Sequence, residues 1–197
     1  MKKLASAVCW EGEKVKGSRF IAHLIPVSVR PDVSHQLSLL WNKYPKATHI
    51  CFAWRLFEGG FLSSDDGEPK GSAGLPILRH LDGAQLVDVL GAVVRFYGGT
   101  KLGVGGLVRA YGGAVSQALK LAKVEEYVLW KTITAQLNYN DYTVLTTVCA
   151  QHQVQVLSVD FEERISFKGL VPLTAVEEFL CDIKAKTCGR VTCLLEV

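Results

Sequence analysis

Several signatures that would assign a biochemical class are missing from this chain of 197 residues. No apolar run approaches the roughly 20 residues that cross a bilayer, and the apolar segment after Met1 is too short for a signal peptide. The six cysteines show no CxxC spacing, so we expect free thiols and no zinc site. These absences favour a cytoplasmic protein with no membrane partner, no metal and no cofactor.

Catalytic and nucleotide-binding signatures are also absent. The glycine-rich string is followed by no GKS or GKT, and the chain has neither a GxSxG elbow nor an RNP-like aromatic motif. The five histidines lack the i, i+4 spacing of metal ligands on a helix. With a net charge of only +3, nucleic-acid binding would need a local basic patch.

What remains is the composition of a globular chain, 49% hydrophobic and 21% charged, with enough residues for one large core or two small ones. In the first part of the chain, apolar periodicity predicts strands over residues 4–10, 18–27, 48–56 and 91–97. It predicts helices from an Asp32 cap to Pro45, in two short pieces between Pro76 and Leu90 with Asp82 capping the second, and from about Gly105 to Lys123.

After Glu126 glycine becomes scarce and a compact alternation begins. The patterns predict strands over 131–139, 154–161, 163–171 and 190–197, and helices over 141–151 and 174–187, with Thr174 capping the last helix. This β-α-β-β-α-β order is typical of a ferredoxin-like domain. The sequence therefore predicts an α+β protein with two domains, residues 1–128 and 131–197.

The stretch from Leu62 to Gly113 holds two glycine-rich loops of opposite charge. The second loop, GGTKLGVGG (98–106), leads into a predicted helix, where unpaired backbone N–H groups and the helix dipole favour an anion. A tight turn with close helix–strand packing would also explain the glycines, but the nearby cations favour a binding loop. Its candidate phosphate- or RNA-binding residues are Arg95, Gly98, Gly99, Lys101, Gly103, Gly105, Gly106 and Arg109.

The first loop, SSDDGEPKGSAG, carries three carboxylates, those of Asp65, Asp66 and Glu68. Clustered carboxylates hold Mg²⁺ or act as general acid and base. A structural interpretation is equally open, since Asp-Gly suits a turn whose acidic side chains accept backbone hydrogen bonds. In a third interpretation, Asp65 or Asp66 pairs with Arg95 or Arg109 and ties the two loops together.

These strings are similar to those of a known family. SSDDGEPKGSAGLPIL followed by VVRFYGGTKLGVGGLVRAYGGA strongly resembles the Impact/YigZ family, as do KGSRFIA, ATHICFAW and, in the tail, LNYNDY and TCGRV. One small departure is RFYGG (95–99), where the family has RYFGG. The resemblance implies an N-terminal domain with the fold of the second domain of a small-subunit ribosomal protein and of the fourth domain of elongation factor G. It implies a ferredoxin-like C-terminal domain similar to the last domain of that factor.

Eukaryotic Impact proteins regulate translation by competing for a partner of an initiation-factor kinase, a pathway that bacteria lack. The resemblance therefore implies only a translation- or RNA-related binding role, and it transfers no catalytic residue. The first hypothesis is a non-catalytic regulator or RNA/ribosome-binding protein, whose partner is RNA, the ribosome or a translation-related protein. The alternative is a phosphate-substrate enzyme, a hydrolase or phosphotransferase, that uses the Asp65, Asp66 and Glu68 loop with or without Mg²⁺.

Overall fold

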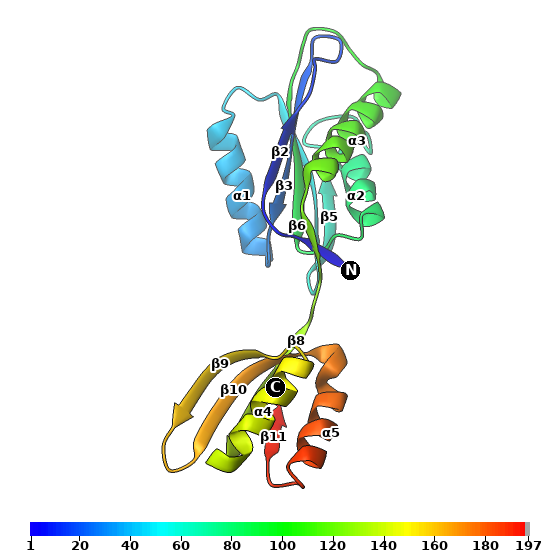
Figure 1. Cartoon of the computed structure of the whole chain (residues 1–197). Coiled ribbons are helices and arrows are strands. Elements are labelled where there is room, and N and C mark those ends of the chain that lie inside the picture. Colours follow the sequence, from blue (N-terminus) through cyan, green and yellow to red (C-terminus); the bar gives the residue numbers. More distant parts are fainter. Residues whose placement is uncertain (196–197) are drawn as a thin grey trace. The chain divides into compact units, whose positions relative to one another are not determined.

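A computed structural model describes residues 1–195 of the chain. The chain divides into two compact units, unit 1 from Met1 to Tyr127 and unit 2 from Val128 to Val197. Each unit has its own antiparallel sheet and its own hydrophobic core, so this is a two-domain α+β protein (Figure 1). No helix within residues 1–195 is both long enough and apolar enough to cross a membrane.

Unit 1 is built on a five-stranded antiparallel sheet with the order β2-β3-β6-β4-β5. A short second sheet pairs β1 with β7 and so joins the start of the chain to the end of the unit. In chain order the elements are β1 (Lys2–Leu4), β2 (Val8–Glu11), β3 (Arg19–Pro26), α1 (Arg30–Lys43), β4 (His49–Leu56), β5 (Gly60–Ser64), α2 (Gly74–Gly83), β6 (Val89–Phe96), α3 (Val104–Leu121) and β7 (Val124–Glu126).

The large sheet of unit 1 is covered on both faces, by α1 on one side and by α2 and α3 on the other (Figure 1). Strand β6 lies at its centre and is buried along nearly its whole length. Because successive side chains of a strand point to opposite faces, β6 serves both layers. Val89 and Val93 join the core under α2 and α3, whereas Ala92 and Val94 join the core under α1.

Helix α3 follows the glycine-rich loop and is amphipathic, as its helical period predicts. The apolar stripe packs against the sheet through its buried members, Leu107, Tyr111, Ala114, Val115 and Ala118. Arg109, Gln117 and Lys120 are exposed on the other side. The helix therefore buries one face and presents its first turn, with the preceding loop, to solvent.

Unit 2 is a four-stranded antiparallel sheet with the order β11-β8-β10-β9 and two helices on one face (Figure 1). Its elements are β8 (Trp130–Leu137), α4 (Tyr139–Gln151), β9 (Gln155–Phe161), β10 (Ile165–Pro172), a single 3₁₀ turn (Leu173–Ala175), α5 (Val176–Lys186) and β11 (Thr192–Leu195). The core takes Leu145 and Val148 from α4 and Val176, Phe179 and Ile183 from α5. Residues 196 and 197, the end of the last predicted strand, lie outside the described residues.

Some local predictions were wrong. Strand β5 was not predicted. Where two short helical pieces were predicted between Pro76 and Leu90, the structure has one helix, α2, which starts at Gly74 and ends at Gly83. Asp82 therefore lies near the end of α2 and caps no second helix. Asp32 lies inside the first turn of α1, where its Oδ2 accepts the N–H of Val29 at 3.2 Å.

Thr174 was the other mistaken cap. It lies within the 3₁₀ turn that precedes α5, and α5 begins at Val176 without a side-chain cap. The capping-box pattern of this segment thus marked the neighbourhood of a helix start but placed the start two residues early.

Candidate functional site

The glycine loop, residues 98–106, spans most of the connection between β6 and α3 and the first three residues of α3 itself. Gly103 is the residue before the helix and has a φ of 73°, a left-handed conformation that favours glycine. No side chain caps α3. Within residues 1–195, none of the backbone N–H groups from Gly99 to Gly106 has a hydrogen-bond acceptor. The run of unpaired amides at the start of an 18-residue helix is a strongly electropositive feature.

Lys101 and Arg109 lie at this loop and are both exposed. The Nη1 atom of Arg109 is 3.8 Å from the position that a Cβ on Gly105 would occupy. The guanidinium therefore folds back over the first turn of α3, because residues four apart lie on one side of a helix. The two predicted cations and the unpaired amides thus share one end of the helix.

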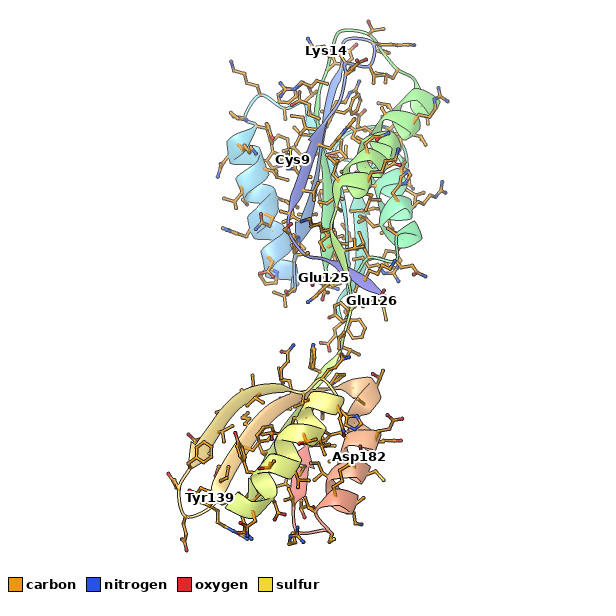
Figure 2. All side chains as sticks on the ribbon, in the orientation of Figure 1. Cys9, Lys14, Glu125, Glu126, Tyr139 and Asp182 are labelled. Atoms are coloured by element: carbon orange, nitrogen blue, oxygen red, sulfur yellow. The ribbon has the colours of Figure 1, made fainter. Side chains whose placement is uncertain are left out.

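Sequence reasoning missed a second source of positive charge at this point, the turn between β2 and β3. Gly17 in that turn packs directly on Gly98, since a Cβ on Gly98 would lie 1.9 Å from the carbonyl carbon of Gly17. This contact brings Lys14, which is labelled in Figure 2, and Lys16 to the end of unit 1 that holds the glycine loop. A hollow of about 240 Å³ lies here, lined by Val15, Lys16, Leu102, Gly106, Arg109 and Ala110.

The sequence signal for these lysines was available but incomplete. The string GEKVKGSRF is plainly basic, yet only the antiparallel pairing of β3 with β6 places it beside the glycine loop. In that register Arg19 is opposite Phe96, so the residues before β3 and those after β6 must meet. Strand pairing between segments so far apart cannot be read from local periodicity.

The acidic loop has structural contacts for all three carboxylates. Asp65 accepts backbone N–H groups from Gly71 at 2.7 Å, Gly74 at 2.8 Å and Ala73 at 3.0 Å, and so satisfies the start of α2. Burial raises the pKa of the Asp65 carboxyl, but the three N–H donors together lower it by more. The net result is a pKa below the ordinary value. The negative charge of Asp65 therefore stabilises backbone N–H groups of the protein itself.

Asp66 and Glu68 are engaged as well. Asp66 has a φ of 41°, and its Oδ2 accepts the N–H of Ile50 at 2.7 Å. Glu68 Oε1 accepts Nη1 of Arg95 at 2.5 Å and the hydroxyl of Tyr111 at 2.7 Å. The third sequence interpretation, an ion pair between the loops, is thus realised by Glu68 and Arg95 and not by either aspartate.

Arg95 links the acidic loop to the glycine loop. It is only 5% exposed, and its Nη2 lies 3.4 Å from the Ser18 hydroxyl, which in turn accepts the N–H of Gly98 at 3.1 Å. A continuous path of polar contacts therefore runs from Glu68 through Arg95 and Ser18 to the first glycine of the loop. Because Arg95 is buried, it holds the loop from beneath and lies out of reach of an external phosphate.

Two titratable side chains beside this path have raised pKa values. Burial raises the pKa of the Cys51 thiol to about 12, so the thiol stays protonated at neutral pH. The pKa of Tyr111 is also raised, first by burial and then by the neighbouring Cys51 and Glu68. Among residues 1–195, no group of three His, Cys, Asp or Glu side chains is arranged to hold a metal ion, and the hollow beside the glycine loop includes no acidic-loop residue.

Comparisons with known proteins match both units. The family model described as the Impact N-terminal domain matches residues 16–119, and one described as a domain of unknown function (DUF1949) matches residues 136–190. An IMPACT family member of Haemophilus influenzae is 37% identical over 98% of this chain and 95% of its own length. The IMPACT family member YigZ of Escherichia coli is 34% identical over 85% and 84%.

One solved structure, a crystal structure of a hypothetical protein, covers all of this chain and 97% of its own, at 30% identity and a TM-score of 0.68. It supports the mixed α+β architecture in two domains. With the N-terminal model matched across both glycine-rich loops and relatives matched along nearly the whole length, the chain belongs to the IMPACT family.

Proposed function

We propose that this protein is a non-catalytic, cytoplasmic RNA- or ribosome-binding protein with a translation-related role, and that the glycine loop contacts the phosphate backbone. One observation carries the proposal: the unpaired amides of residues 99–106 lie with exposed Lys101 and Arg109 at the start of α3. A phosphate placed there would accept N–H groups and meet two cations. Charge-assisted hydrogen bonds of this kind contribute about 1.5–3 kcal/mol each.

The lysines of the β2–β3 turn extend the same surface. Lys14 and Lys16 are exposed and add two charges beside a hollow that Arg109 lines. A chain with a net charge of +3 thus gathers four cations at one end of unit 1. Such a local patch is the electrostatic footprint that phosphate binding needs.

The contacts of the acidic loop favour binding over phosphate chemistry with Mg²⁺. A magnesium site needs carboxylate oxygens that face the ion and its waters. In this chain Asp65 accepts three amides, Asp66 accepts one, and Glu68 is paired with Arg95. We therefore assign the acidic loop the role of holding α2, β4 and β6 at the base of the glycine loop.

The finer description of each fold is part of the same proposal. In unit 2, the order β11-β8-β10-β9 with two helices on one face supports a ferredoxin-like domain. For unit 1, the resemblance of its motifs supports the fold of the second domain of a small-subunit ribosomal protein. This kinship with translation proteins is a fold-level analogy that favours RNA or a ribosomal surface as the partner.

The test compares two double variants of the full chain in binding to a fluorescein-labelled RNA hairpin across a series of KCl concentrations. Lys101→Ala/Arg109→Ala should weaken binding at least about tenfold and reduce the salt slope by about two, one for each lost phosphate contact. The control, Lys120→Ala/Lys123→Ala, removes equal charge from exposed positions at and beyond the far end of α3. Equal RNA affinity in wild type and the Lys101/Arg109 variant would reject the proposal.

A turnover assay distinguishes the binding function from the alternative, a phosphate-substrate enzyme. Hydrolysis of a simple phosphomonoester by the wild type with Mg²⁺, abolished by Asp66→Asn, would favour the phosphate-substrate enzyme. Because the Asp66 carboxylate also accepts the Ile50 amide, the variant must first give the circular dichroism spectrum of the wild type.

A further inference from the structure

Tyr97 is an exposed aromatic residue at the start of the glycine loop. It directly precedes Gly98, and 46% of the residue is exposed. Phe96, the aromatic residue before it, is half-buried and packs against the core under α1. The proposed function makes no use of the Tyr97 ring.

The ring of Tyr97 is held in place from one side. The guanidinium carbon of Arg95 lies over it, 5.4 Å from the ring centroid, and Arg95 is itself fixed by its buried ion pair with Glu68. Thr48 fixes the backbone, because its N–H donates to the Arg95 carbonyl at 2.8 Å and its hydroxyl accepts the Tyr97 N–H at 3.0 Å. A side chain that is ordered in advance loses less entropy when a ligand binds.

The other side of the ring has no such contact. Within residues 1–195, no second cation and no aromatic ring packs on Tyr97. Because the guanidinium takes one face, the exposure of Tyr97 belongs to the opposite face and the ring edge. A fixed ring with one open face is a stacking surface for a planar ligand.

This ring lies close to the unpaired amides of the glycine loop. The first of them, the N–H of Gly99, is two residues from Tyr97. Two residues of extended chain span at most about 7 Å, which is comparable to the reach from a phosphate to the base of the same nucleotide. A phosphate on the first amides of the loop therefore carries a base to the neighbourhood of the ring.

We propose that Tyr97 stacks on an unpaired base, and that the glycine loop therefore selects single-stranded RNA. The inference rests on the proposed function, because the phosphate contact brings the base to the ring. Bases within a duplex already stack on one another, whereas those of single strands, loops and ends are free to stack on aromatic side chains. Stacking uses the π face that every base has, so we expect little sequence preference.

The surroundings of Tyr97 favour a nucleic acid over a protein partner. A protein interface would call for an apolar centre around the aromatic residue. Residues 98–101 are instead exposed and read Gly-Gly-Thr-Lys, without an apolar side chain. Amides and a cation beside one flat ring match the phosphates and bases of a single strand.

The test uses the full chain and two fluorescein-labelled ligands of about 10 nucleotides, an oligouridine and an abasic RNA with the same number of phosphates. Tyr97→Leu should raise the Kd for oligouridine at least about fivefold, because one base loses its aromatic partner. The Kd for the abasic RNA should stay within about twofold of the wild type, and the salt slope should not change, because no charge is lost. A rise in Kd for both ligands would mean that the variant acts by disturbing the loop, and would overturn the inference.

Tyr139→Leu is the matched control. Tyr139 is 54% exposed and lies in unit 2, where Figure 2 labels it. Its replacement makes the same chemical change and should leave the Kd for oligouridine within about twofold of the wild type.

A second measurement does not depend on a loss of affinity. Tyr97→Trp keeps an aromatic surface, so it should bind oligouridine at least as tightly as the wild type. Saturating oligouridine should quench the added tryptophan fluorescence, since a stacked base is an efficient quencher, and the abasic RNA should not. Tyr139→Trp is the control and should show no added quenching with either ligand. Absence of quenching in Tyr97→Trp would overturn the inference.

The outcomes separate the inference from the proposed function. If Lys101→Ala/Arg109→Ala bound both ligands like the wild type, the phosphate contact would be rejected and the placement of the base with it. If that variant lost affinity for both ligands while Tyr97→Leu bound oligouridine normally, the proposed function would stand and only the stacking would be rejected. Two further results would overturn the inference: a blunt RNA duplex that binds as tightly as oligouridine of equal charge, and uridine monophosphate that displaces oligouridine at equal concentration.

Discussion

Glu68 and Arg95 form an ion pair that water hardly reaches, with side chains only 4% and 6% exposed and 2.5 Å between Oε1 and Nη1. The same carboxylate oxygen accepts the hydroxyl of Tyr111 at 2.7 Å. A loop, strand β6 and helix α3 therefore meet at one carboxylate. An unpaired charge in the protein interior is costly. Removal of one partner of this ion pair should therefore strongly lower the free energy of unfolding of unit 1.

Glu68→Ala should lower the free energy of unfolding by about 3–5 kcal/mol, since Arg95 would remain buried without its counter-ion. The Nε atom of Arg95 already lacks an acceptor within residues 1–195, and the hydroxyl of Ser18 at 3.4 Å is a poor substitute. Urea denaturation followed by tryptophan fluorescence reports mainly on unit 1, which holds Trp10, Trp41 and Trp54.

Glu11→Ala is the matched control. Glu11 pairs with Arg19 in two hydrogen bonds, but these side chains are 44% and 40% exposed. Solvent screens such a pair, so its removal should cost far less. Similar losses in the two variants would show that burial does not set the importance of the Glu68–Arg95 pair.

Gly98→Ala should destabilise unit 1 and weaken RNA binding together. The added Cβ would lie 1.9 Å from the carbonyl carbon of Gly17 and 2.2 Å from the N of Ser18, so the β2–β3 turn must separate from the glycine loop. Overpacking of this kind costs about 1–3 kcal/mol or more. Thermal unfolding and the RNA hairpin titration measure the two effects.

Gly113→Ala makes the same chemical change where nothing lies within 4 Å of the new Cβ. Gly113 is an exposed residue within α3, and alanine is favoured over glycine in a helix by about 0.8–1.0 kcal/mol. The variant should therefore be more stable than the wild type with unchanged RNA affinity. A Gly98→Ala protein that behaves like Gly113→Ala would refute the packing of Gly98 on Gly17.

The fold was largely accessible from the sequence where the pattern is strong. Apolar runs such as 91–97, and the stripe of α3, give clear strand and helix signals because both are buried in the core. β5 lacked such a signal, since this edge strand exposes Phe61 and Leu62 alike and shows no alternation. Element ends were the weakest point, as the misplaced caps at Asp32 and Thr174 show.

The candidate site was predicted by residue type but not by contact. Dense glycine and nearby cations identified the loop, yet the burial of Arg95 and its choice of Glu68 depend on how β6 pairs with its neighbours. From the sequence alone, Asp65 and Asp66 were equally plausible partners for Arg95, but both carboxylates accept backbone N–H groups instead. Long-range register, which also brings in Lys14 and Lys16, is the information that local sequence lacks.

Asp65→Asn should lower stability at neutral pH and flatten its dependence on acid. Burial raises the pKa of Asp65, but the N–H groups of Gly71, Gly74 and Ala73 lower it more, so the folded pKa lies below the ordinary 3.8. A depressed carboxyl pKa gives stability that is present above the unfolded pKa and lost as pH falls through the folded pKa. The asparagine amide does not titrate and turns its own NH₂ toward N–H donors.

Urea denaturation of the wild type and Asp65→Asn at pH 7, 4 and 3 measures this effect. The two free energies of unfolding should converge as the pH falls below about 4, where the wild-type carboxyl becomes protonated. A gap that stays constant down to pH 3 would mean that the hydrogen bonds of Asp65 do not depend on its charge.

His23 should make unit 1 sensitive to mild acid. The ring is buried between β2 and α1, with Nε2 3.1 Å from the Tyr44 hydroxyl and 3.8 Å from Cys9 Sγ. Burial, helped by the charge of Lys43, lowers its pKa to about 4. The unfolded chain, with an ordinary pKa of 6.5, therefore binds the proton more readily than the folded one, so stability rises with pH between about 4 and 6.5.

The wild type should thus lose on the order of 2 kcal/mol of unfolding free energy between pH 7 and pH 4.5, after allowance for solvent screening. His23→Gln keeps a hydrogen-bonding group near Tyr44 but cannot titrate, so its stability should fall less over the same interval. His35→Gln, at an exposed position of α1, is the control and should retain the wild-type pH dependence. Urea denaturation of the three proteins at pH 7.0, 5.5 and 4.5 decides the matter. If His23→Gln lost as much stability as the wild type, other groups would have to account for the acid sensitivity of the unit.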